Sequence, residues 1–184
     1  MLYTINFLSL FTIGGVTGLF CAAFNVDVHI HDTYFIVAHF HYTMLGGAIM
    51  GFFSGLFYWF PKMSGKMYNE LNGRISAIMT FVGFNLTFIP QFIMGSQGMP
   101  RRYHTYDGVF APYHIASTIG SWILAAGFIW SIIILVRAFF SKTAPKAPLN
   151  PWGGTTLEWE AGSPPIHTNF EETPLVEGRP YEYR

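Results

Sequence analysis

Apolar residues dominate four long stretches of this chain, and short polar segments separate them. The stretches cover about residues 2–24, 33–60, 75–94 and 113–139, and the charge inside them is confined to Arg137. A helix needs about 20 apolar residues to cross the hydrocarbon core of a bilayer, and its backbone must form its hydrogen bonds internally. The pattern therefore predicts an all-α membrane protein with four transmembrane helices.

Charge is scarce and unevenly distributed. Charged residues make up 11% of the 184-residue chain, against about 25% in a typical soluble domain. Nine of the twenty lie in residues 1–136 and eleven in the last 48 residues. We expect a membrane-embedded part, residues 1–142, followed by an extended polar tail on the inner side, residues 143–184. The net charge of zero excludes a basic nucleic-acid-binding surface.

The loops predict the orientation of the helices. Lys62, Lys66 and Arg74 follow the second stretch, and Arg137, Lys142 and Lys146 lie at or after the end of the fourth. The positive-inside rule then places both chain ends and the 61–74 loop inside, and loops 25–32 and 95–112 outside. Arg101 and Arg102 lie on the outer side against this rule, so they need another explanation.

Glycine and proline mark two further features of the apolar stretches. Gly47, Gly51 and Gly55 repeat every fourth residue in the second stretch. Such a stripe favours a close helix–helix crossing. The alternative is a helix face that lacks side chains so that a flat cofactor can lie against it. Pro90 interrupts the third stretch and predicts a kink, or an end to the regular hydrogen bonding there.

Two histidines lie inside the second stretch, where ionisable residues are candidates for function. His39 and His41 are two residues apart, which corresponds to about 200° of rotation on a helix. They therefore point to nearly opposite sides and cannot bind one metal ion together. If both are ligands, they serve two centres, and axial ligation of haem suits imidazoles in a helix bundle. Hydrogen bonding of each histidine to a neighbouring helix, with no metal, is the alternative.

Charged residues at the outer ends of two stretches suggest further binding groups. His31 and Asp32 suit Mg²⁺ or Mn²⁺ if water or another chain supplies more ligands. An aspartate at the positive end of a helix dipole is the alternative. Arg101 and Arg102 would suit the propionates of a haem held by His39, because arginine binds carboxylates bidentately. A pair of surface side chains that reach for water is the alternative for the arginines.

One block of the chain resembles the hallmark of haem–copper oxidase subunit I, of the cytochrome c oxidase type: HDTYFIVAHFHY, residues 31–42. Three further blocks agree with this family in order and spacing: GGVTG (14–18), NLTFIPQFIMGSQGMPRRY (85–103) and LEWEAGSPPIHTNFEE (157–172). The resemblance covers about residues 8–172. It implies that the four helices are helices nine to twelve of a twelve-helix subunit I bundle.

The resemblance implies a role for each residue around the two histidines. His39 is expected to be the axial ligand of the high-spin, oxygen-binding haem, a3 in type, and so to serve the catalytic centre. His41 is expected to be one of two axial ligands of the low-spin haem, a in type. Phe40 would lie between the two haems.

The resemblance also implies roles for the outer residues. Arg101 and Arg102 would hold haem propionates, and Asp27 would lie near the propionates of the a3-type haem. His31 and Asp32 would contribute to a Mg²⁺ or Mn²⁺ site that subunit II completes.

Some parts of the family's chemistry fall outside these four helices. The histidines that bind copper (CuB) lie on earlier helices, so another chain, or a missing part of this one, would hold it. We expect this chain to be inactive alone and to assemble with the amino-terminal part of subunit I and with subunits II and III. The complex would take electrons from cytochrome c, reduce O₂ to water and pump protons, in a bacterial or mitochondrial inner membrane. A quinol oxidase and a haem-free structural or transport module in the membrane are the alternatives.

Overall fold

The computed structural model describes residues 1–175, which fall into two compact units. Unit 1 comprises Met1–Ser54 and Arg74–Ser131, and unit 2 comprises Gly55–Gly73 and the chain from Ile132 onward. Within residues 1–175 the regular structure is helical, with two isolated β-bridges and no strand. Four helical segments are long and apolar enough to cross a membrane. The all-α membrane class is therefore confirmed.

The helices follow the predicted stretches, with different ends. In chain order the elements are α1 (Leu2–Ala22), α2 (Phe24–Ile30), α3 (Tyr34–Thr43), the π-helical η1 (Met44–Ile49), α4 (Met50–Ser64), α5 (Glu70–Ser96), the 3₁₀-helical η2 (Gly108–Phe110), α6 (Ala111–Phe140) and the 3₁₀-helical η3 (Leu157–Trp159). Helices α4, α5 and α6 extend beyond the apolar stretches, since helix ends are set by capping rather than by hydropathy. Gly65 and Gly98, just past α4 and α5, have positive φ angles of 68° and 87°, which is typical of residues that end helices.

One segment differs from the sequence-based expectation, and a second bears on the prediction for Pro90. The outer loop 25–32 is largely helical, because α2 begins directly after a break at Ala23 (φ −79°, ψ 106°). Pro90 lies inside α5 and does not end it. A proline removes only one backbone N–H donor, so the other hydrogen bonds of a long helix can still form on both sides of it.

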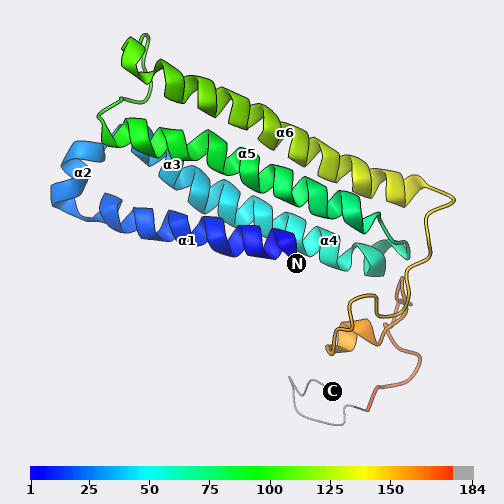
Figure 1. Cartoon of the computed structure of the whole chain (residues 1–184). Coiled ribbons are helices and arrows are strands. Elements are labelled where there is room, and N and C mark those ends of the chain that lie inside the picture. Colours follow the sequence, from blue (N-terminus) through cyan, green and yellow to red (C-terminus); the bar gives the residue numbers. More distant parts are fainter. Residues whose placement is uncertain (176–184) are drawn as a thin grey trace. The chain divides into compact units, whose positions relative to one another are not determined.

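Helices α1, α3, α5 and α6 lie side by side in unit 1 (Figure 1). Their closest approaches occur at glycines. A Cβ atom added at Gly14 of α1 would lie 2.9 Å from the backbone nitrogen of Thr43. Between α5 and α6, a Cβ at Gly83, Gly120 or Gly127 would collide with backbone of the facing helix. These glycines allow the helix backbones to approach where a larger residue would separate them.

The glycine stripe of the second span has a different role. A Cβ at Gly47 would lie 2.8 Å from the Phe11 ring, and one at Gly51 would lie 3.9 Å from the Phe7 ring. Both phenylalanines belong to α1. The stripe therefore receives side chains, and the crossings of closest backbone approach are made by other glycines.

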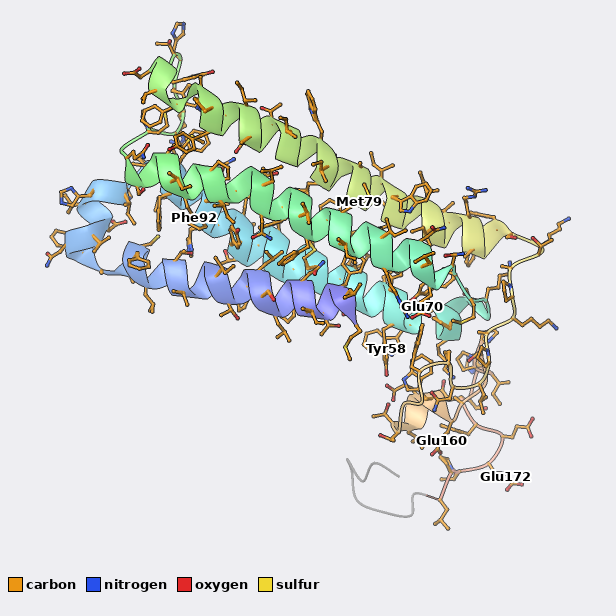
Figure 2. The ribbon with its side chains drawn as sticks, viewed as in Figure 1. Tyr58, Glu70, Met79, Phe92, Glu160 and Glu172 are labelled. Carbon is orange, nitrogen blue, oxygen red and sulfur yellow. The ribbon has the colours of Figure 1, made fainter. Side chains whose placement is uncertain are left out.

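Unit 2 joins the end of α4 to the polar tail. Trp159 is 1% exposed, and its Nε1 donates to the Tyr58 hydroxyl at 2.8 Å (Figure 2 labels Tyr58). Lys62 is 7% exposed, and its Nζ donates to the Ala161 carbonyl at 2.6 Å and to those of Leu149 and Gly162 at longer distances. The tail has little regular structure, but its described residues are fixed to the helix end by these contacts.

Candidate functional site

Helix α3 presents His39 and His41 to different neighbours. Thr17 Oγ1 of α1 lies 3.2 Å from His39 Nδ1, and a Cβ at Gly18 would lie 3.1 Å from His39 Cε1. His41 instead stacks on Phe88 of α5, with ring centroids 4.4 Å apart. The two imidazoles thus face opposite neighbours, as the two-residue spacing requires.

Both imidazoles use Nδ1 for a hydrogen bond inside the chain. His41 Nδ1 lies 2.8 Å from the Val37 carbonyl oxygen, which can only accept, so Nδ1 carries the proton. Thr17 Oγ1 lies 2.9 Å from two carbonyl oxygens of the preceding turn and donates its proton there, so it accepts from His39 Nδ1. Neither Nε2 has a hydrogen-bond partner within residues 1–175. A ring held at Nδ1 with the Nε2 lone pair free is the arrangement of a metal ligand.

Aromatic packing fixes α3 against α5 around these rings. The Phe40 ring stacks on His41 with centroids 4.6 Å apart. Tyr42 is fully buried, and its hydroxyl donates to Asn85 Oδ1 at 2.9 Å. Phe92, which extends from α5 (Figure 2), lies 5.3 Å from the Tyr42 ring centroid. This packing leaves the histidines little freedom to turn away from their neighbours.

The two loops predicted to lie outside meet at one end of unit 1. Tyr34 N donates to the Met99 carbonyl at 3.0 Å, and Arg101 N donates to the Asp32 carbonyl at 2.9 Å. This pairing holds the start of α3 against the segment that follows α5. It brings the predicted acidic and basic residues together, although they are far apart in the sequence.

Asp32 and Arg101 form an ion pair. Arg101 Nε donates to Asp32 Oδ1 at 2.7 Å, and Nη2 contacts the same oxygen. The hydrogen bond from Arg101 holds the pKa of Asp32 below its usual value, with a smaller contribution from the nearby positive charge. His31 lies between two carboxylates, 3.5 Å from Asp27 and 3.9 Å from Asp32. Within residues 1–175 no three such ligands converge, so a cation bound here needs further ligands from elsewhere.

The structure also bears on the two alternatives, a helix-start role for Asp32 and a surface role for the arginines. Thr33 caps α3, because its Oγ1 accepts from Phe35 N at 3.2 Å. Asp32 precedes this cap and adopts a positive φ of 57°, with its carboxylate on Arg101. Arg102 is exposed, has a φ of 60° and forms no ion pair within the described residues. Of the two adjacent arginines, Arg102 is thus the one whose donors have no partner among the described residues.

Sequence reasoning missed the residues that support the two histidines. Thr17 and Gly18 lie in the GGVTG block, which the sequence offered only as a family resemblance. Phe88 is one of several phenylalanines in an apolar stretch, and no local pattern distinguishes it. Their contacts with His39 and His41 depend on which helices become neighbours.

The fold and the site together define a multi-pass helical membrane protein with a pair of partly buried imidazoles on one helix. A family model described as "Cytochrome C and Quinol oxidase polypeptide I" matches residues 1–123. The chain therefore belongs to the family of subunit I polypeptides of haem–copper oxidases.

Similar proteins agree with this membership. The chain is 48% identical over its whole length to "Cytochrome c oxidase subunit 1" of Synechocystis sp. and 43% identical to that of Thermostichus vulcanus. It is 44% identical over 96% of its length to that of Cereibacter sphaeroides. The chain spans about a third of the length of these relatives (33%, 33% and 31%).

A solved structure shares the fold. A cryo-EM structure of a heme-copper terminal oxidase dimer matches with a TM-score of 0.70 and 24% identity, over 79% of this chain and 27% of that one. At this identity the match concerns the helical arrangement alone.

Proposed function

We propose that His39 and His41 are axial ligands of two different haems, His39 of the high-spin a3-type haem and His41 of the low-spin a-type haem. The observation that carries the proposal is the hydrogen bonding of the rings, since each is fixed at Nδ1 and leaves Nε2 free on its own side of α3. When bound, the two haems supply electron transfer and oxygen binding.

Close packing around each ring would hold it in place as a ligand of a flat cofactor. On the His39 side, α1 presents Gly18, where even a Cβ would crowd the imidazole. On the His41 side, the ring lies between Phe40 and Phe88, which stack with it. These contacts and the Nδ1 hydrogen bonds orient the imidazoles, so that the Nε2 lone pairs would be directed to the ligand positions. Phe40 would separate the two cofactors.

The outer residues would bind the haem propionates and a divalent cation. Arg102 and the remaining donors of Arg101 suit propionate carboxylates, and Asp27 lies in the same outer layer. Arg101 also fixes Asp32 through its ion pair. His31 and Asp32 would bind Mg²⁺ or Mn²⁺ with ligands from subunit II, because the chain itself brings no third ligand within its described residues.

We infer that the whole protein is a cytochrome c oxidase that reduces O₂ to water and pumps protons. The relatives named cytochrome c oxidase subunit 1 support this choice, while the family model also covers quinol oxidases. The chain would supply helices nine to twelve of subunit I, whose amino-terminal part carries the copper ligands. Subunits II and III, a cytochrome c donor and a bacterial or mitochondrial inner membrane would complete the system.

Absorption spectra of the purified complex test the ligand assignment. The His39→Ala complex should lose the high-spin haem and retain the low-spin haem, and the His41→Ala complex should show the reverse. His104→Ala, which changes a histidine outside the site, serves as the control and should retain both. If His39→Ala keeps the high-spin haem, or His41→Ala keeps the low-spin haem, that assignment is wrong. A purified complex without haem absorption would instead favour a structural or transport module.

A further inference from the structure

Four basic residues gather around the carboxy-terminal end of α6 in unit 2. Arg137 lies in its last turn, and Lys142 and Lys146 follow it. Lys66 joins them through an antiparallel bridge with Lys146. Two backbone hydrogen bonds flank this bridge, at 2.8 and 2.9 Å. We call these four residues the basic cluster.

The chain uses one of these charges for itself. Lys66 Nζ donates to the carbonyl oxygens of Phe139 at 2.6 Å and Ser141 at 2.8 Å. These carbonyls belong to the helix end, where the backbone has no internal partner and the dipole is negative. Lys66 therefore already caps α6, and the other three cations are not needed for that purpose.

The remaining charge of the basic cluster is uncompensated. Arg137, Lys142 and Lys146 are exposed, and none forms an ion pair within residues 1–175. Like charges that face each other across a bridge repel, as Lys66 and Lys146 do here. An anion bound between these side chains would relieve the repulsion.

The position of the basic cluster indicates the kind of anion. The spanning segment ends at Phe140, so Arg137 lies within its last turn and both lysines lie just beyond it. Val136, Phe139 and Phe140 are exposed at 47%, 53% and 75% beside these cations. The surface thus offers positive charge at the level of the headgroups and apolar surface at the level of the chains. We propose that the basic cluster binds the phosphate of an anionic phospholipid of the inner leaflet.

The proposal is tested on the purified oxidase complex, extracted from membranes of phosphatidylcholine with or without phosphatidylglycerol. Native mass spectrometry measures the lipid that each complex retains. The wild type should retain phosphatidylglycerol over phosphatidylcholine. The double variant Lys142→Gln/Lys146→Gln should bind it about tenfold or more weakly, since each cation near an anionic lipid surface strengthens binding about fivefold. Raised salt should weaken retention by the wild type in the same way.

Two control variants separate a site from a general charge effect. Lys142→Arg/Lys146→Arg keeps both charges and should retain the lipid. Arg74→Gln removes a charge predicted to lie on the same side, outside the basic cluster, and should also retain it. Equal retention of both lipids, or a glutamine variant that binds like the wild type, would overturn the proposal.

Two further outcomes would identify another occupant and also overturn the proposal. If inorganic phosphate at equal concentration displaces the retained phosphatidylglycerol from the complex, the basic cluster is a free-phosphate site. If the glutamine variant loses a protein subunit while its phosphatidylglycerol is unchanged, the partner is an acidic protein surface.

Discussion

The chain treats polar groups among its apolar helices in two different ways. Around Lys62 in unit 2, the ammonium group donates to three carbonyl oxygens, and the nearby Trp159 Nε1 donates to Tyr58. Around His39 and His41 in unit 1, each ring has one nitrogen held and one without a partner among the described residues. In the first region the chain itself provides the hydrogen-bond partners, whereas in the second it provides a partner for Nδ1 alone among the described residues.

This difference separates two functions of buried polar residues. A buried cation with all its donors used stabilises the fold, since an unpaired polar group would cost about 1–3 kcal/mol. A ring with one fixed and one free nitrogen is oriented for a ligand. Changes near Lys62 should therefore release the tail without altering the haem spectrum. Changes near His39 should alter the haem spectrum and leave the tail docked.

The largest effect is expected from Lys62→Met. Three carbonyl oxygens lose their buried donor, so docking of the tail should weaken by about 3 kcal/mol. Limited proteolysis of the complex should then cleave residues 143–175 much faster, with an unchanged haem spectrum. Glu172→Gln, at an exposed residue of the tail, provides the control and should leave cleavage as in the wild type. A protected tail in the Lys62→Met complex would show that the contacts of Lys62 do not hold it.

A smaller effect is expected from Gly18→Ala. The added Cβ would lie 3.1 Å from His39 Cε1, so the imidazole must shift, at a cost of about 1–3 kcal/mol. The high-spin haem band should shift while the low-spin band stays in place. Gly15→Ala is the matched control, because a Cβ there meets nothing within 4 Å. Identical spectra for both variants would argue against His39 as the ligand of the high-spin haem.

Thr17→Val tests the hydrogen bond to His39 Nδ1. Without this acceptor the imidazole is a weaker donor to iron, so the reduction potential of the high-spin haem should rise. A bond worth about 1 kcal/mol corresponds to a rise of about 40 mV for one electron. Redox titration measures it, and Thr17→Ser, which keeps the hydroxyl, should restore the wild-type potential. If Ser and Val behave alike, the hydroxyl does not act on His39.

The last effect is absent at neutral pH and develops only at alkaline pH; it concerns Tyr68 in unit 2. Burial, and then the charge of Glu70, raises the pKa of Tyr68 to about 12. The unfolded chain therefore loses this proton first, and stability should fall as the pH rises above the ordinary value of 10 toward 12. Tyr68→Phe should remove this part of the alkaline loss and leave stability at neutral pH nearly unchanged. Thermal unfolding of the complex at a series of alkaline pH values measures it, and parallel curves for the two proteins would contradict it.

Much of the fold could be predicted from local patterns. Four apolar stretches predicted four spanning helices because lipid leaves the backbone no other arrangement. The ends of the helices were less predictable. The short helix α2 and the first residues of α5 lie in segments that were expected to be loops. The two-residue spacing of His39 and His41 predicted opposite directions, because helix geometry is independent of the neighbours.

Other features could not be predicted, because they depend on contacts between distant segments. Lys62 was interpreted as a residue that sets orientation, and the structure buries it against the tail. The Gly47 stripe was expected to mark a close crossing, and it lies against phenylalanine rings of α1, whereas Gly14 and the glycines of α5 and α6 lie against backbone. The pairing of Asp32 with Arg101 joins two loops 69 residues apart.

The sequence by itself determined that four helices cross a membrane and that His39 and His41 point away from each other. Hydropathy and helical rotation act along the chain and need no partner. Only the tertiary structure decided that α1 supports His39, that α5 supports His41 and that both rings are held at Nδ1. These choices depend on which helix faces pack together, and that is set by the fit of glycines and phenylalanines across the whole bundle.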